Sequence, residues 1–151
     1  RQRQMCIRDR YKVGYIAGVF DLFHIGHLNM FKRAKEQCRY LIVGVVSDEG
    51  VRLNKQAEPF VPFDERIEMV RSCKYVDEAI KLPLDFCGTR DMFKIYHFDV
   101  QFSGSDYEHD PAWLAEKEFL EKNGSTMVFF PYTQSTSSTK LKKAIENRIN
   151  N

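Results

Sequence analysis

The sequence lacks the long apolar stretches and the cysteine patterns that would place it in a membrane or in a disulfide-stabilised class. No apolar run in its 151 residues approaches the roughly 20 that a membrane-spanning helix needs. The four cysteines have irregular spacing and form no C-x-x-C pair, which argues against a disulfide framework. The N-terminal residues are charged and lack the apolar core of a signal peptide. We therefore expect a cytoplasmic protein that does not associate with membranes.

The sequence also lacks a strong excess of either charge. Its formal net charge is +2, but residues 1–10 (RQRQMCIRDR) contribute +3 and the remainder carries −1. These ten residues show no apolar periodicity, and residues 5–10 resemble translated adapter sequence from a sequencing library. We therefore treat residues 1–10 as a non-native or disordered segment and residues 11–151 as one domain. The near neutrality of that domain argues against nucleic acid as a partner.

Along the sequence, patterns typical of strands alternate with patterns typical of helices. Apolar runs predict buried strands, and apolar positions three or four apart predict helices. The expected strands are 13–17, 40–46, 76–80, 99–102 and 126–130. The expected helices are 26–37, 64–73, 90–97, 111–122 and 137–149, with a loop over 50–62. This order predicts a doubly wound, Rossmann-like α/β fold, with helices on both faces of a five-stranded parallel sheet.

The loop after the first strand is the first candidate for a binding site, since ligands of such sheets bind beyond the carboxyl ends of the strands. It reads GVFDLFHIGH over residues 18–27. His24 and His27 can lie on one side of a first helical turn, and Gly26 lets a ligand approach the backbone. The unpaired N–H groups of a helix N-terminus suit phosphate. The loop therefore predicts a phosphate-handling site.

Other interpretations of this loop fit the sequence less well. Two histidines could bind zinc or simply face solvent, but His97 and His109 lie elsewhere at no ligand spacing, so we expect no protein-bound metal. The glycines form neither a G-x-G-x-x-G motif nor a Walker A loop. A Rossmann dehydrogenase or a P-loop kinase is therefore disfavoured.

The same residues resemble a known enzyme family. Val19-Phe20-Asp21 followed by His24-Ile25-Gly26-His27 is similar to the H-x-G-H signature of the cytidylyltransferases. This family includes glycerol-3-phosphate, choline-phosphate and ethanolamine-phosphate enzymes. Near the end of the chain, Ser137-Ser138-Thr139 resembles the close of the family's R-T-E-G-I-S-T-T signature, with Tyr132 in place of its arginine.

The resemblance implies transfer of CMP from CTP to a small phosphorylated alcohol, with release of pyrophosphate. Mg²⁺ is expected to accompany the triphosphate, and Asp21 and Asp106 are candidates to orient groups or the ion. The implied catalytic residues are His24, His27 and Lys55. The implied nucleotide contacts are Val19, Phe20, Asp21, His24, Gly26, His27, Gly104, Asp106, Tyr132, Ser137, Ser138 and Thr139. The implied contacts with substrate phosphate are Lys55, Arg66, Lys74 and Arg90.

The acceptor stays open at this point. The short chain resembles the glycerol-3-phosphate branch, whereas residues 20–24 and 43–45 are more similar to the choline-phosphate branch. Glycerol 3-phosphate is our first prediction, with phosphocholine or phosphoethanolamine as alternatives. An adenylyltransferase of the same fold and an inactive nucleotide-binding domain are further alternatives. Because homodimers are usual in the family, we also predict a homodimer.

Overall fold

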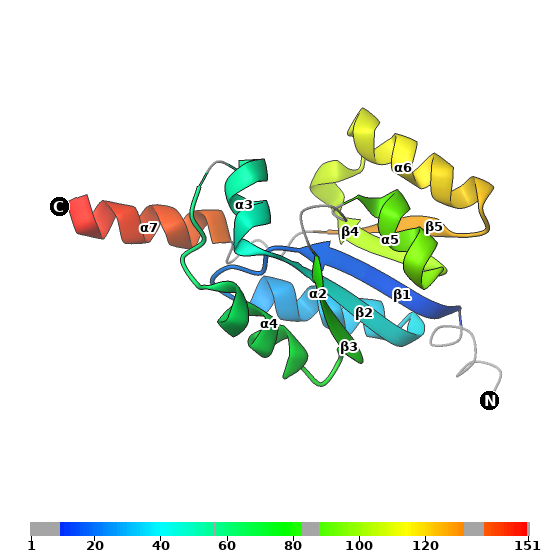
Figure 1. The fold of residues 1–151 in the computed structure, drawn as a ribbon, viewed down its shortest axis with the longest axis horizontal. Coiled ribbons are helices and arrows are strands. Elements are labelled where there is room, and N and C mark those ends of the chain that lie inside the picture. Colours follow the sequence, from blue (N-terminus) through cyan, green and yellow to red (C-terminus); the bar gives the residue numbers. More distant parts are fainter. Residues whose placement is uncertain (1–9, 56, 83–87, 132–137, 151) are drawn as a thin grey trace.

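One parallel sheet forms the centre of the molecule in the computed structural model, which describes residues 10–55, 57–82, 88–131 and 138–150. Its five strands lie in the order β3-β2-β1-β4-β5 (Figure 1). The strands are β1 (Tyr11–Gly18), β2 (Cys38–Val46), β3 (Glu78–Leu82), β4 (Val100–Gly104) and β5 (Thr126–Phe130). The helices are α2 (Ile25–Lys35), α3 (Asp48–Lys55), α4 (Phe63–Arg71), α5 (Thr89–Tyr96), α6 (Pro111–Lys122) and α7 (Ser138–Asn150), with a 3₁₀ helix η2 (Ser105–Tyr107).

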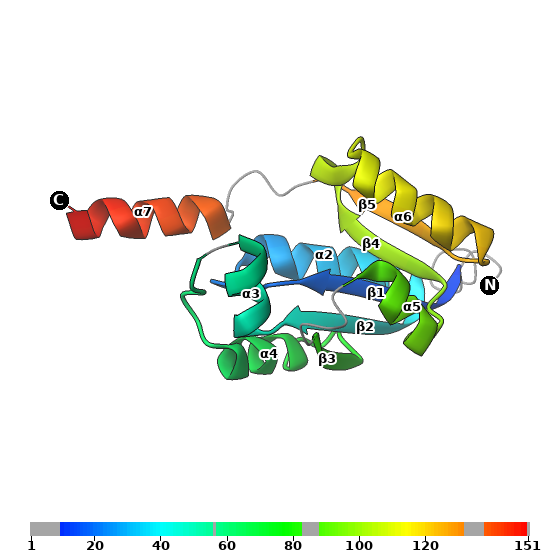
Figure 2. The same ribbon diagram turned by 45° about the horizontal axis from the view of Figure 1, so that its top comes forward.

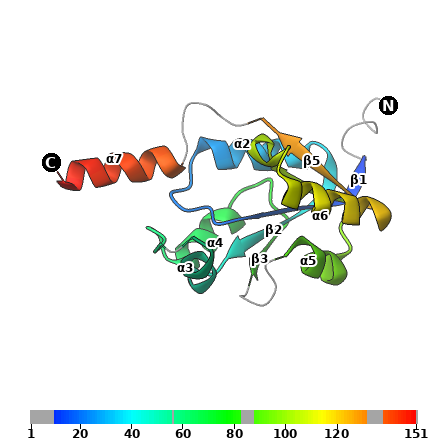
Figure 3. The same cartoon turned by 90° about the horizontal axis from the view of Figure 1, so that it is seen from above.

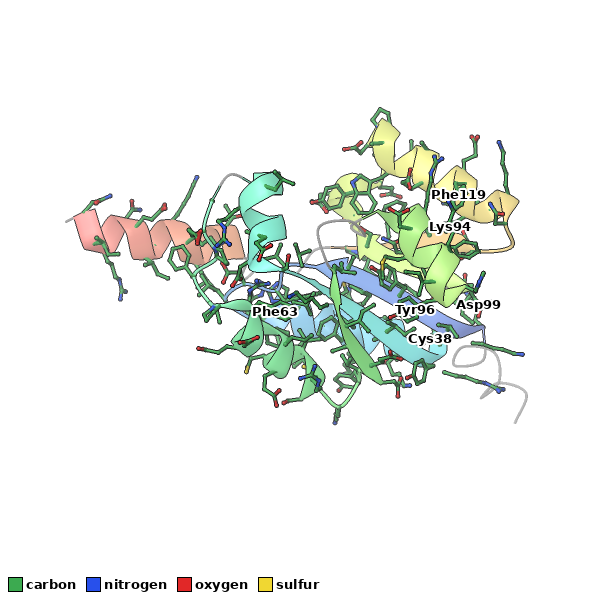
Figure 4. The ribbon with its side chains drawn as sticks, viewed as in Figure 1. Cys38, Phe63, Lys94, Tyr96, Asp99 and Phe119 are labelled. Atoms are coloured by element: carbon green, nitrogen blue, oxygen red, sulfur yellow. The ribbon has the colours of Figure 1, made fainter. Side chains whose placement is uncertain are left out.

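Two apolar clusters, one on each face of the sheet, hold the helices in place. On one face, Phe31 of α2 and Val70 of α4 pack against the strands. On the other face, Met92 of α5 and Leu120 of α6 do the same. Figure 3 shows the sheet and its helices from above, with α7 extending away from them. The predicted doubly wound α/β fold is therefore confirmed.

The strand order locates a switch point beside the central strand. From β1 the chain winds to β2 and β3 on one side, and then returns to β4 and β5 on the other. The loops that leave β1 and β4 therefore diverge at the carboxyl edge of the sheet, which is where ligands of such folds bind. Both loops contain residues that the sequence predicted to be functional.

The segment after β2 differs from the prediction. We expected a loop over 50–62, but α3 occupies the first part of it. Asp48 and Glu49 lie in the first turn of α3, where their charges suit the helix dipole, and Val51 is buried. The two prolines that suggested a loop lie beyond the end of this helix, so the prediction extended the loop too far back. The predicted boundary at residue 10 falls beside residues 1–9, which lie outside the described part.

The last helix extends away from the rest of the fold (Figures 1 and 2). Among its described side chains none is buried; Leu141, Lys142 and Ile145 are half-buried, and Ile149 is 77% exposed. Apolar packing therefore contributes little to its attachment. Across the residues that the structure describes, no helix is long and apolar enough to cross a membrane.

Candidate functional site

The loop that leaves β1 makes a strained turn that is fixed by the core. Phe20 and Leu22 both have left-handed backbones, with φ of 58° and 51°, which is uncommon for residues other than glycine. The ring of Phe20 is buried and packs against His27 and Phe31. Our expectation that Phe20 contacts a nucleotide can therefore apply to its backbone only. Its side chain instead holds the turn against the sheet.

The two histidines cap the helix that follows. His24 is the N-cap residue of α2, and its Nδ1 accepts a hydrogen bond from the Gly26 amide at 3.0 Å. In return, Nδ1 of His27 accepts one from the His24 amide at 3.1 Å. This reciprocal arrangement is a capping box, in which Ser or Thr and Glu or Gln usually take the two positions. Both rings are therefore oriented by the backbone of the helix terminus.

The capping hydrogen bonds also assign the tautomer of each ring. A neutral imidazole whose Nδ1 accepts a hydrogen bond has its proton on Nε2. Burial lowers the pKa of His24, and burial together with the neighbouring His24, whose ring centre is 4.0 Å away, lowers the pKa of His27 to about 3. At neutral pH His27 is therefore uncharged. The pair offers Nε2–H donors to a ligand rather than two positive charges.

Aromatic contacts fix the His27 ring further. Phe23 stacks on it with ring centres 5.2 Å apart, and the edge of Phe20 approaches it at 5.4 Å. A ring held between two others and a backbone hydrogen bond loses little further freedom when a ligand arrives. The donor of His27 is therefore preorganised.

Asp21 joins this loop to the segment between α3 and α4. Its carboxylate is 2% exposed and accepts hydrogen bonds from the amides of Phe60 at 2.8 Å and Val61 at 2.9 Å. Lys142 of α7 adds an ion pair at 3.0 Å. Burial alone would raise the pKa of Asp21, but these donors outweigh it and keep the pKa below its usual value. With its oxygens facing protein donors, Asp21 does not fit the expected role of a Mg²⁺ ligand.

Arg66 lies beneath the same loop and not in an open site. Its guanidinium is 1% exposed and donates to the carbonyls of Val19, Val46 and Val61, each at 2.8 Å. It also pairs with Asp48 at 2.5 Å. We expected Arg66 to bind substrate phosphate, but these contacts take up the guanidinium inside the protein. Arg66 holds the carboxyl ends of β1 and β2 together.

An uncovered patch of the central strand lies at the same edge. Ala17 is exposed although β1 has neighbours on both sides. Side chains alternate along a strand, so Ala17 faces the same side as Tyr15, which belongs to the cluster under α5 and α6. On that side, the end of β1 is thus open to a ligand. This open patch was not predicted from the sequence, in which its only sign is a pair of small residues, Ala17 and Gly18, at the end of β1.

Comparisons with known proteins identify the family of this chain. A family model described as cytidylyltransferase-like matches residues 15–144. The chain belongs to the cytidylyltransferase-like family. It is thus a member of a nucleotidyltransferase family, as the H-x-G-H resemblance indicated.

The relatives of this family member carry different substrate names. An FAD synthase of Thermococcus kodakarensis is 37% identical over 139 residues, 89% of each chain. An ethanolamine-phosphate cytidylyltransferase of Dictyostelium discoideum is 41% identical over 141 residues, which is 91% of this chain but only 39% of that protein. A glycerol-3-phosphate cytidylyltransferase of Bacillus subtilis is 32% identical over 128 residues, 85% of this chain and 92% of that protein.

Solved structures share the fold. A lipopolysaccharide core biosynthesis protein of Thermoplasma volcanium superposes with a TM-score of 0.66 at 25% identity, over 83% of this chain and 99% of that one. A pantoate-beta-alanine ligase of Francisella tularensis has a TM-score of 0.60 at 14% identity, over 96% of this chain and 73% of that one. The second likeness concerns the fold alone.

Lys74 and Arg90, the two cations predicted to bind substrate phosphate from other parts of the chain, lie at opposite edges of the sheet. Lys74 lies between α4 and β3 and is exposed, with its ammonium 5.3 Å from the Tyr75 ring centre. Because β3 begins there, this is the amino edge of the sheet, opposite the histidines, and the predicted phosphate contact of Lys74 stays a prediction. Arg90 lies in the first turn of α5 at the carboxyl edge, where Glu116 pairs with it at 3.2 Å.

The remaining predicted residues lie at the carboxyl edge or outside the described part. Gly104 ends β4 and is buried, Asp106 is exposed in η2, and Thr139 is exposed in the first turn of α7. Val19 accepts the hydrogen bond from Arg66, and Gly26 donates to His24.

Tyr132 and Ser137 lie outside the described residues, as do the side chains of Lys55 and Ser138. Their predicted roles stay predictions.

Replacing Arg66 tests whether it organises the site. Arg66→Met keeps the apolar bulk but leaves three carbonyls without their donor, so the free energy of unfolding should fall by about 3–5 kcal/mol. The matched control is Arg71→Met in the same helix, where an exposed pair with Glu68 is lost and the change should be within about 0.5 kcal/mol. Urea unfolding followed by circular dichroism measures both. Equal effects of the two substitutions would contradict the assignment.

The depressed pKa of His27 predicts a pH dependence of stability. An unfolded histidine takes up a proton below pH 6.5, whereas folded His27 does so near pH 3. Its contribution to stability is thus complete above pH 6.5 and is lost as the pH falls from there toward 3. His27→Gln keeps an N3 capping acceptor and removes this titration. Between pH 7.5 and 5, wild type should lose about 1–2 kcal/mol more unfolding free energy than His27→Gln. A parallel decline in both proteins would refute the depressed pKa.

Proposed function

We propose that this protein transfers CMP from CTP to the phosphate of a small phosphorylated alcohol, with glycerol 3-phosphate as the first acceptor to test, and releases pyrophosphate. The observation that carries the proposal is the pair of Nε2–H donors held at the N-terminus of α2 by the capping box. Both donors lie at the carboxyl edge of the sheet, beside the open end of β1. A helix N-terminus with fixed neutral donors suits a polyphosphate.

The chemistry needs positioning and charge stabilisation rather than a covalent intermediate. An oxygen of the acceptor phosphate attacks the α-phosphorus of the nucleotide, and the bond to the β-phosphate oxygen breaks as pyrophosphate leaves. Negative charge grows on the leaving pyrophosphate and on the α-phosphoryl oxygens. Hydrogen-bond donors already directed at these oxygens stabilise the transition state. His24 and His27 would supply such hydrogen bonds without gaining or losing a proton. No general base is required, because the attacking phosphate oxygen is already ionised.

The other proposed participants surround this pair. Lys55 ends α3, so its backbone stands at the start of the segment that Asp21 anchors at Phe60 and Val61. We propose that its ammonium bridges the reacting phosphates. Thr139, together with Ser138, would receive the outer phosphates at the start of α7. Mg²⁺ would arrive with the triphosphate and neutralise part of its charge.

The relatives support two candidate nucleotides. The ethanolamine-phosphate and glycerol-3-phosphate cytidylyltransferases support CTP. The FAD synthase match spans 89% of both chains, and this observation favours a second candidate, transfer of AMP from ATP to a flavin phosphate. A homodimer and a cytoplasmic location also remain proposals; light scattering of the purified protein tests the first.

Direct assay of the purified chain separates these candidates. The protein is incubated with CTP or ATP, Mg²⁺ and one acceptor at a time: glycerol 3-phosphate, phosphocholine, phosphoethanolamine or flavin mononucleotide. We expect pyrophosphate release with CTP and a phospho-alcohol. Release only with ATP and flavin mononucleotide would replace the first candidate by the second. No release with any pair, despite nucleotide binding in calorimetry, would indicate an inactive nucleotide-binding domain.

Substitutions that preserve the helix cap test the histidines specifically. His24→Asn and His27→Gln keep side-chain acceptors for the capping amides but move the remaining N–H donors away from the positions of the imidazole Nε2 atoms, so kcat should fall about 10²–10³-fold while the melting temperature changes little. The control is His97→Asn, at the far end of α5, where Asn tolerates the left-handed backbone of φ 50°. Turnover in His24→Asn or His27→Gln close to that of His97→Asn would remove the histidines from the reaction.

A further inference from the structure

One charged side chain of α7, Lys142, reaches the site loop. Lys142 is half-buried in a helix whose other described side chains are half-buried or exposed. Its Nζ lies 3.0 Å from Oδ2 of Asp21 and 5.7 Å from the centre of the Phe60 ring. The ammonium is thus held by a carboxylate and an aromatic face together. The first contact lies in the site loop, and the second lies in the segment between α3 and α4 that Asp21 binds.

The partner of Lys142 is unusually well anchored. Asp21 lies between the two left-handed residues of the site loop, three positions before His24. Its carboxylate also receives the amides of Phe60 and Val61. Three separate segments of the chain therefore meet at one buried carboxylate. An ion pair to such a fixed group is worth more than one between two mobile surface side chains.

The geometry of a helix links this contact to the start of α7. Residues three apart lie on the same face, so Thr139 occupies the face that Lys142 turns toward Asp21. Lys142 lies one turn into the helix, and its ion pair brings the N-terminus of α7 to the site loop. That terminus holds Thr139 and Ser138, which we proposed as contacts of the outer phosphates.

From this arrangement we infer that Lys142 is a positioning residue, which latches α7 to Asp21 and so presents the start of that helix to the nucleotide. The inference rests on the proposed function for its role in nucleotide binding, but the latch itself is a property of the unliganded protein. Lys142 differs in this respect from a cation that binds phosphate directly, because its charge already faces Asp21 and the Phe60 ring.

The first test follows the latch without any substrate. Lys142→Met keeps the aliphatic stem and removes the charge, so the amides of residues 142–147 should exchange with deuterium at least about tenfold faster than in wild type, since helix opening no longer breaks an ion pair. Lys143→Met is the matched control, one residue along on the exposed surface, and should not change the exchange. Lys142→Arg should restore protection. Unchanged exchange in Lys142→Met would overturn the latch, whatever the protein catalyses.

The second test asks how the latch acts on the reaction. Lys142→Met should raise KM for the nucleotide about ten- to a hundredfold, the size of a charge-assisted hydrogen bond, with a smaller change in kcat. Lys143→Met should match wild type, and Lys142→Arg should recover most of the affinity. An equal fall in kcat and kcat/KM without a change in KM would overturn the positioning role. If no nucleotide supports turnover in wild type, the proposed function fails while the exchange result still decides the latch.

A double-mutant cycle distinguishes the latch from direct phosphate binding. If Lys142 acts through Asp21, then Lys142→Met should add little once Asp21 has been replaced by Asn. A full additional loss of nucleotide affinity in the Asp21→Asn background would mean that Lys142 contacts the phosphates itself, and would overturn the inference. Circular dichroism and the melting temperature verify that each variant is folded. Lys142→Leu, which also removes the donor to Asp21, replaces Lys142→Met if the latter does not fold.

Discussion

The buried guanidinium of Arg66 is the interaction on which the carboxyl edge of the sheet depends. Backbone carbonyls in the turn after β1 and at the end of β2 face this guanidinium. Arg66 donates to Val19, Val46 and Val61 and balances its charge with Asp48. A lysine could not replace it, since a single ammonium lacks the planar set of donors that reaches several carbonyls at once. By donating to the carbonyl of Val19, Arg66 stabilises the strained turn.

Given that support, the histidines can serve the helix and the ligand at the same time. Asp at the N-cap would satisfy the amides equally well but would leave no donor for a ligand. Imidazole has two nitrogens, so Nδ1 caps the helix while Nε2–H remains for a ligand. Protonation would place an Nδ1–H against an amide N–H and break the cap, which agrees with the depressed pKa of His27. The capping geometry and the burial that lowers the pKa therefore both favour the neutral ring.

The sequence predicted the sheet and the site loop better than the surroundings of individual cations. The apolar strands and the H-x-G-H loop are local patterns, and α6 and β5 matched their predicted boundaries. Arg66 was misassigned because a helical arginine gives no local sign that it points inward; its burial depends on carbonyls 20 and 47 residues away. The position of Lys74 at the edge opposite the histidines could not be predicted, because motif position does not say which edge of the sheet a turn occupies. Helix α3 was not predicted, because the prolines that follow it suggested a loop.

These placements change how positive charge reaches the site. Arg66, Arg90 and Lys142 are each paired with a carboxylate, and the histidines are held neutral or nearly so. Among the described residues, the groups left to meet a triphosphate at the loop are therefore mainly uncharged N–H donors and the N-terminal dipoles of α2 and α7. Such donors strengthen as charge grows on phosphate, yet they neutralise little of it in the ground state. In the proposed reaction, that division would assign the bulk of ground-state neutralisation to Mg²⁺ and Lys55, and would leave the fixed donors to act where charge develops.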